Sequence, residues 1–178
     1  SNFTWLVLDN WDLTSLPITE NWYNWSHHPM NFMFSMWYLQ KLSMRNWKIP
    51  EGFSKTLWSR NTSLSTNTMQ EMDVSWWDLS RTRNLAWLFA GSCVRKIVWL
   101  ETWDTSNITN MNEMFQFDIN LTWINLSSFD TSNVTSMSYM FHGCTSLTWL
   151  DLSSFDTTNV NNMYSMFLSN DNLKTIYV

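Results

Sequence analysis

Carboxylates recur at a fixed interval in this chain, and oxygen atoms stacked in that way could in principle hold Ca²⁺. Asp78, Asp104, Asp130 and Asp156 are each 26 residues apart. Calcium takes six to eight oxygen ligands, so a column of carboxylates is a candidate site. Lys48 interrupts the column, and the neighbouring Ser and Thr residues favour the capping of turns over ion binding. We therefore predict no metal site.

The other reactive side chains are few. The only two cysteines are Cys93 and Cys144, separated by nearly two 26-residue intervals. Strands stacked ~4.8 Å apart would place them roughly 10 Å from each other, beyond the reach of a disulfide. Two buried thiols are expected instead. His27 and His28 are adjacent, and His142 stands far from them; none has a partner at metal-ligand spacing, which predicts solvated loops.

A catalytic grouping is hard to assemble from these residues. The chain contains no recognisable Ser/His/Asp or Cys/His arrangement and no glycine loop of the kind that holds phosphates. An enzyme would need Glu20, His27 and His28 to supply the catalytic pair. The sequence therefore predicts a protein that is not an enzyme and that needs no cofactor, with the enzyme hypothesis resting on those three residues alone.

Composition limits the other function classes. The chain has 178 residues, only 14% of them charged, and a net charge of −5, so nucleic acid is not a natural partner. Its 14 Trp, 12 Met and 11 Phe supply enough apolar area for one folded domain over 1–178. No apolar run approaches the roughly 20 residues of a membrane span. Because the chain begins without a signal-like segment, we expect any leader or anchor to lie outside this fragment.

The clearest pattern is a repeat of 26 residues. An aromatic residue followed by Asp recurs at Trp77, Trp103, Phe129 and Phe155. After each pair, towards the C-terminus, apolar residues follow with spacings of three, three and one, a pattern typical of one face of a short helix. Its clearest copies are Ile108, Met111, Met114, Phe115 and Val134, Met137, Met140, Phe141. Before each pair, towards the N-terminus, lies a short pattern typical of a strand. A fixed period of this size predicts a solenoid.

We accordingly predict an α/β repeat fold. It is a leucine-rich-repeat solenoid of about seven coils, with a parallel sheet on one face and short helices or helical turns on the other. Residues 69–178 follow the 26-residue period regularly, whereas 1–68 are irregular and carry insertions expected at 17–28 and 52–65. The aromatic column is expected to stack through the core, and the Asp-Thr-Ser-Asn segments behind it to cap turns and bond to neighbouring coils.

The repeated phrases resemble a known family. "WDTSNITNMNEMF" and "FDTSNVTSMSYMFHGCTSLTWLDLSS" are similar to the BspA-like, DUF285-type leucine-rich repeats of bacterial surface proteins, over about 99–178 and more weakly over 69–98. The resemblance implies a secreted or cell-surface location, a place within a longer surface protein, and a role in adhesion or host contact. The sequence departs from the family pattern at Arg95, where a strand leucine belongs, and at Thr82.

Strand alternation turns two columns of side chains outward. With a constant 26-residue offset the first is Trp5, Lys41, Glu71, Ile97, Trp123, Trp149 and Thr175, and the second is Val7, Ser43, Asp73, Trp99, Asn125, Asp151 and Tyr177. The predicted ligand-binding residues are the aromatic residues of these columns over the last four strands, with the neighbouring Asn and Asp: Trp99, Trp123, Trp149, Tyr177, Asn125 and Asp151. Cover by a neighbouring domain, by the loop 17–28 or by a second copy is the alternative.

Two functions follow from this pattern. The first is an extracellular binding or adhesion module that presents the aromatic face to a host protein or glycan. The second is a structural spacer or assembly array that projects other domains, with self-association end to end or face to face. The last strand-like segment, Leu173 to Val178, is not followed by a polar capping repeat, which favours the array.

Overall fold

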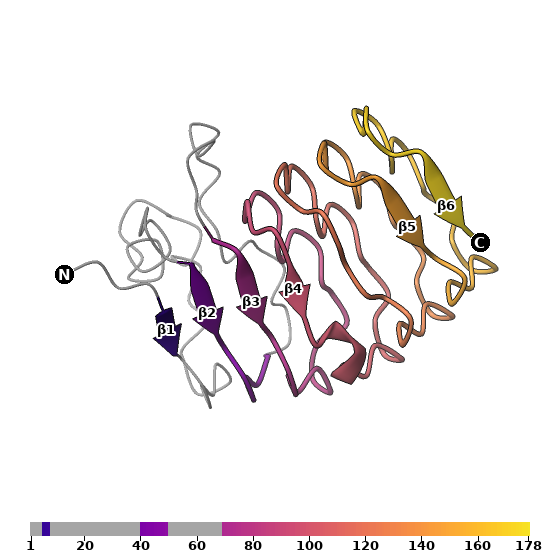
Figure 1. Ribbon diagram of the computed structural model, residues 1–178. Coiled ribbons are helices and arrows are strands. Elements are labelled where there is room, and N and C mark those ends of the chain that lie inside the picture. The colour runs from indigo at the N-terminus through magenta and orange to yellow at the C-terminus, as the bar shows by residue number, and fades with distance from the viewer. Residues whose placement is uncertain (1–4, 8–39, 50–68) are drawn as a thin grey trace, which may run out of the picture.

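A computed structural model describes residues 5–7, 40–49 and 69–178 of the chain. Its strands are β1 (Trp5–Val7), β2 (Lys41–Ser43), β3 (Glu71–Asp73), β4 (Ile97–Val98), β5 (Trp149–Asp151) and β6 (Thr175–Tyr177). A 3-10 helix, η4 (Leu100–Thr102), follows β4. The strands lie side by side in chain order from β1 to β6 (Figure 1). The insertions expected at 17–28 and 52–65 lie outside the described residues.

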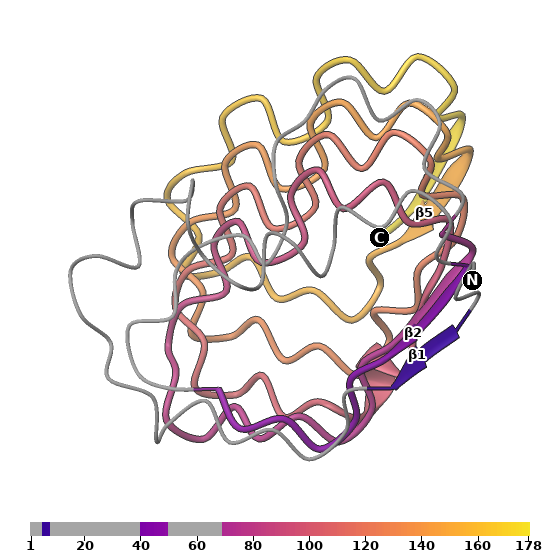
Figure 2. The same ribbon diagram turned by 90° about the vertical axis from the view of Figure 1, so that its left-hand side faces the viewer.

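All the paired strands are parallel. One sheet has the order β1-β2-β3-β4 and the other is the pair β5-β6. Lys41 pairs with Trp5 on one side and with Glu71 on the other, and Trp149 pairs with Thr175. Seen along the stack, the strands occupy one side of the cross-section, and turns and extended segments enclose the interior on the other sides (Figure 2).

The predicted register is wrong at β4. Ile97 pairs with Met72 and is fully buried, so it belongs to the core and not to the outward column. Lys96 takes the outward place, in a bridge with Trp123. The reason is that Val94, also fully buried, fills the core position that the constant offset gave to Arg95.

One inserted residue then restores the 26-residue offset. Asp73 pairs with Val98, 25 positions later, while Trp77 stacks on Trp103, 26 positions later. The additional residue is Trp99, whose backbone is left-handed at φ 69° and which precedes η4. Such an insertion leaves one side chain outside the strand pairing, as in a β-bulge.

Two columns of stacked rings run through the core. In one, Trp47, Trp77, Trp103 and Phe129 follow one another with ring centroids 5.4, 5.0 and 6.4 Å apart. In the other, Phe89, Phe115, Phe141 and Phe167 are separated by 5.6, 5.5 and 6.0 Å. The indole N–H of Trp103 donates to the carbonyl of Val74 at 2.7 Å, so the polar edge of this buried ring is satisfied. The predicted stacking of the aromatic column is confirmed from Trp47 to Phe129.

The segments expected to be helical are consecutive turns. In 85–92, the N–H of Leu88 donates to Leu85 O at 3.2 Å within the same repeat, but the N–H of Trp87 donates to Asn112 O of the next repeat at 3.0 Å. An α-helix needs each N–H to bond four residues back along its own segment. Alternate N–H groups instead tie neighbouring repeats together, and the positive φ of 68° at Trp87 interrupts any helix.

Polar side chains join successive repeats as predicted. The Oδ1 atom of Asp104 accepts the N–H of Ser106 at 3.0 Å, which closes a local turn. Thr105 Oγ1 donates to Asp130 O at 3.1 Å, and Asn133 Nδ2 donates to Ser106 O at 2.8 Å. These bonds satisfy backbone carbonyls that would otherwise be left unpaired. The abundance of Asp, Thr, Ser and Asn thus has an architectural cause.

We propose that these repeats are successive coils of the leucine-rich-repeat solenoid expected from the sequence, with the seven-coil count still a prediction. The proposal is supported by strands, rings and hydrogen bonds that join residues about 26 apart throughout 69–178. Among the described residues, no helix has the length and apolar character needed to cross a membrane.

Candidate binding face

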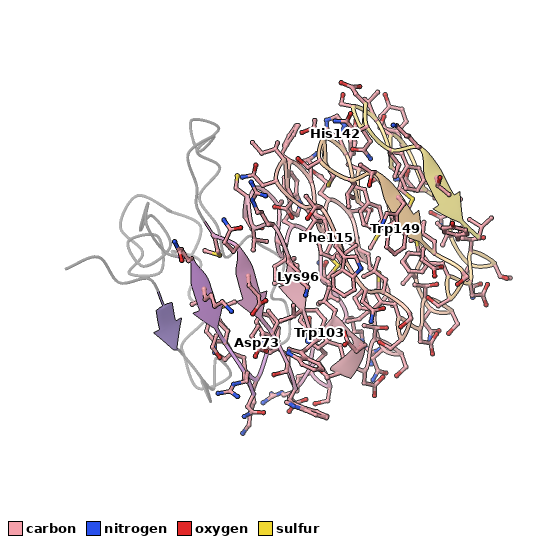
Figure 3. The ribbon with its side chains drawn as sticks, viewed as in Figure 1. Asp73, Lys96, Trp103, Phe115, His142 and Trp149 are labelled. Carbon is pink, nitrogen blue, oxygen red and sulfur yellow. The ribbon has the colours of Figure 1, made fainter. Side chains whose placement is uncertain are left out.

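The outward side chains of the strands form a surface that we call the strand face. Its first column contains Lys41, Glu71, Lys96, Trp123, Trp149 and Thr175. At the β2 and β3 end it is charged, and Lys41 Nζ lies 3.5 Å from Glu71 Oε1. At the β5 and β6 end the strand face is aromatic, with Trp149 in the first column and Tyr177 in the second. Lys96 and Trp149 both lie on this face, whereas Phe115 lies in the interior (Figure 3).

Trp149 and Tyr177 form the centre of the aromatic end. Their rings are 6.5 Å apart in an edge-to-face arrangement, with an interplanar angle of 76°. Trp149 lies on β5 and Tyr177 on β6, where Tyr177 pairs with Asp151 and so lies two positions beyond Thr175, the partner of Trp149. They are 40% and 58% exposed. Two large rings with this much accessible area and few rotatable bonds suit a binding surface.

Trp123 is also on this face but is half-buried. The ammonium group of Lys96 lies 5.0 Å from the centroid of its ring, within the range of a cation–π contact. This arrangement places a cation in the position that the sequence analysis gave to Ile97. The signal for it was present in the sequence, because Arg95 interrupts the apolar pattern and marks the shifted register.

Trp99 does not belong to either outward column. It is 52% exposed, but it is the inserted residue between β4 and η4, and Val98 occupies the column position predicted for it. The predicted column position of Trp99 is therefore wrong. The contact that the structure does show among the four predicted aromatic residues is the Trp149 and Tyr177 pair.

Asn125 and Asp151 both act as turn acceptors. Asn125 Oδ1 accepts the N–H of Ser127 at 3.1 Å. Asp151 Oδ1 accepts the Oγ hydroxyl and the N–H of Ser153 at 2.7 and 3.0 Å, and these bonds hold the pKa of Asp151 below its usual value. Asp151 is exposed beside Trp149 and Tyr177 and is ionised at neutral pH. The aromatic end of the strand face thus combines two exposed rings with the negative charge of Asp151.

Comparison with known proteins identifies part of the chain. Residues 92–176 match the family described as "Mycoplasma protein of unknown function, DUF285". That part of the chain belongs to the DUF285 family. The match confirms the DUF285-type resemblance found in the repeated phrases. No curated protein and no solved structure matches the chain.

The DUF285 segment contains both cysteines, and the prediction of two buried free thiols is confirmed. Burial and the nearby Asp118 carboxyl raise the pKa of Cys93 to about 11. Burial also raises the pKa of Cys144 well above its usual value, and its Sγ atom lies 3.0 Å from Phe115 O as a hydrogen-bond donor. Both side chains are therefore protonated, packed groups at neutral pH.

We expect both thiols to resist alkylation in the folded protein. A pKa of about 11 for Cys93, in place of 9.0, reduces its thiolate fraction about 100-fold at pH 7.5, and burial limits access further. Iodoacetamide labelling followed by intact mass should show no adduct during the time in which a urea-unfolded sample is fully labelled. Equal labelling rates in the two samples would contradict the buried assignment.

The stacked aspartates of the DUF285 segment are exposed and already bonded. Asp130 Oδ1 accepts the hydroxyl of Ser132 at 2.6 Å, which lowers the pKa of Asp130 although Asp104 and Asp156 repel its charge. These carboxylates therefore act as turn acceptors. In 40–49 and 69–178, no three His, Cys, Asp or Glu side chains gather in a way that could hold a metal ion.

Proposed function

We propose that the chain is a non-catalytic binding module of a secreted or cell-surface protein, and that its strand face engages a host protein or glycan. The observation that supports this proposal is the exposed pair of Trp149 and Tyr177 on adjacent strands. Aromatic rings held by a rigid sheet lose little conformational freedom on binding and bury a large apolar area. Asp151 beside them would fix the orientation of a hydroxyl or a cation in the partner.

The state of the reactive groups supports the non-catalytic part of the proposal. The exposed aspartates accept bonds from the Ser or Thr two residues later, and the two cysteines are buried as thiols. A nucleophile needs an activating base and access to substrate. The residues Glu20, His27 and His28, on which the enzyme hypothesis rests, lie outside the described residues.

The double substitution Trp149→Ala/Tyr177→Ala should weaken partner binding at least tenfold, because truncation of a central aromatic residue costs about 2 kcal/mol or more. The melting temperature should change little, since both rings lie on the surface and outside the packed core. The measurement is titration of the chain against a panel of host matrix proteins and glycans, with binding followed by tryptophan fluorescence.

Trp76→Ala is the matched control, because Trp76 is 66% exposed but lies outside the strands. It should leave binding unchanged. Binding that survives the double substitution in a folded protein would contradict the role of the strand face. The absence of any bound ligand in the panel would favour the second candidate function.

That second candidate is an assembly or spacer array. In the last repeat Met163 is 48% exposed and Ile176 is 37% exposed, whereas their counterparts one repeat earlier, Met137 and Leu150, are buried. Side chains of core type at the β6 end of the stack fit end-to-end contact between copies of such an array. The array would project other domains and would need no ligand on the strand face.

A further inference from the structure

A second group of aromatic side chains lies on the turns that precede the strands. We call it the turn-edge cluster, and it consists of Phe117, Tyr139, His142 and Tyr164. His142 is 4.8 Å from Phe117 and 5.4 Å from Tyr139, and Tyr139 is 5.4 Å from Tyr164, all between ring centroids and all edge to face. The four rings thus form one continuous series across three successive repeats.

The cluster is accessible and separate from the strand face. Phe117 is 38% and Tyr164 is 66% exposed, and the other two rings are half-buried. His142 lies on the upper turns in Figure 3, away from Trp149 on β5. Exposed apolar area that is contiguous over several residues usually marks an interaction site.

The backbone under the cluster is in a conformation that large side chains disfavour. Phe117 has φ 60° and Tyr139 has φ 57°. The residues one repeat before and after Phe117 are Gly91 and Gly143, which adopt φ 72° and 73° without a side-chain penalty. Stability alone would favour glycine at 117 as well. A bulky residue kept in a strained, exposed position is a reason to look for a function there.

The rings are fixed in place by their surroundings. The Nδ1 atom of His142 lies 2.9 Å from the carbonyl oxygen of Leu168, so it carries the proton and donates. The ring of Phe117 packs directly on Gly143, where an added Cβ would lie only 2.6 Å from Phe117 Cδ1. A ligand would therefore meet a preformed surface and would not have to order it.

The chemistry of the cluster favours an uncharged, hydroxyl-rich ligand. In the neutral tautomer with Nδ1 donating, Nε2 of His142 can accept a hydrogen bond, and the two tyrosine hydroxyl groups can donate or accept. None of the four side chains carries a formal charge in this state, and Glu113 acts electrostatically on Tyr139, which disfavours an anionic ligand. Ring faces suit the apolar faces of sugars, and ring edges suit their hydroxyl groups.

We propose that the turn-edge cluster is a binding site for a neutral oligosaccharide that runs across neighbouring repeats. Each of the three repeats contributes at least one ring, and the rings follow one another at 4.8 to 5.4 Å, so a polymer of sugar rings would meet them in succession. This site is independent of the strand face.

The test uses an array of neutral tetrasaccharides that includes chitotetraose and cellotetraose, with a heparin tetrasaccharide as the anionic probe. Titration calorimetry then measures the strongest neutral binder against the 178-residue chain and three variants. Phe117→Gly and Tyr164→Ala should each weaken binding about tenfold or more. Phe117→Gly places at 117 the residue that both neighbouring repeats carry, so folding should be retained, with the melting temperature as the check.

Trp76→Ala, which belongs neither to the cluster nor to the strand face, should bind the neutral tetrasaccharide as the unchanged chain does. The proposal is wrong if no neutral tetrasaccharide binds, if the two cluster variants bind with undiminished affinity, or if the heparin fragment binds better than every neutral probe. Loss of binding in Trp76→Ala alone would place sugar binding outside the cluster and would also overturn the proposal. The two proposals can fail separately: if the titrations of the Trp149→Ala/Tyr177→Ala variant contradict the role of the strand face, the outcome of the tetrasaccharide experiment still stands.

Discussion

Replacing Phe115 by alanine should lower the free energy of unfolding by about 3 to 5 kcal/mol. Phe115 is fully buried, and its ring stacks on Phe89 at 5.6 Å and on Phe141 at 5.5 Å. Truncation would remove the transfer energy of the ring and leave a cavity between two repeats. It would also break the continuity of the ring column. Urea unfolding followed by circular dichroism measures the change.

Phe117→Ala provides a control two positions away. Phe117 is exposed, so its truncation should cost less than about 1 kcal/mol, in the range of surface substitutions. The comparison keeps residue type and repeat constant and changes only burial. Similar losses for the two variants would mean that the core of this repeat is not where the ring column places it.

The period of 26 residues made the core predictable. Each repeat must bury the same face against its neighbours, so the same residue type recurs at the same position. The inward residues Met111, Met114 and Phe115 were predicted from spacing alone and are fully buried. Within 69–178 the strand register departs from the constant offset at β4, where a one-residue deletion before Ile97 is compensated by the insertion of Trp99. A constant offset cannot detect two changes that cancel.

The turns could not be distinguished from helices by the apolar spacing. Spacings of three, three and one fit one stripe of a helix, but they also fit consecutive turns that place the same side chains inward. The backbone hydrogen bonds decide the outcome, and half of them cross to the next repeat, as in the bond from Phe115 N–H to Met140 O at 2.9 Å. The residue pattern of a single repeat does not show whether its backbone N–H groups bond within that repeat or to the next one.

The candidate sites were only partly predictable for a similar reason. The Trp149 and Tyr177 pair follows from strand alternation within a regular region. The turn-edge cluster joins Phe117, His142, Tyr139 and Tyr164, which occupy different positions of their repeats and so form no column in the sequence. His142 was expected in a solvated loop because no metal-ligand partner lay near it in sequence. Its partners are the rings of Phe117, in the preceding repeat, and of Tyr139, in its own repeat.

The largest pH effect should come from Asp118. Its carboxyl is fully buried; Oδ1 accepts the hydroxyl of Ser92 at 2.7 Å and the N–H of Cys93 at 3.2 Å, whereas Oδ2 has no partner within the described residues. Burial raises the pKa of Asp118 well above its usual value, and the bonds from Ser92 and Cys93 only partly oppose this. The titratable side chains that interact with it are the thiols of Cys93 and Cys144.

Because the folded protein holds this proton more tightly than the unfolded chain, stability is greatest below the unfolded pKa of 3.8 and falls as pH rises toward the folded pKa. Between the unfolded and the folded pKa, the one extra proton held by the folded protein lowers the free energy of unfolding by about 1.4 kcal/mol for each unit that the pH rises. Urea unfolding at pH 5, 6 and 7 should show the decline, and Asp118→Asn should remove this contribution, since Asn keeps the acceptor for Ser92 and cannot ionise.

Asp104→Asn is the control, because Asp104 is exposed and the hydroxyl and N–H of Ser106 lower its pKa. A lowered pKa stabilises the fold above the unfolded value and loses that contribution only as pH falls through the folded value, so Asp104 contributes a constant amount from pH 5 to 7. Its variant should keep the wild-type slope. If Asp118→Asn also keeps that slope, Asp118 is ionised in the folded protein, and its unpaired oxygen must then be stabilised by a bound water or cation.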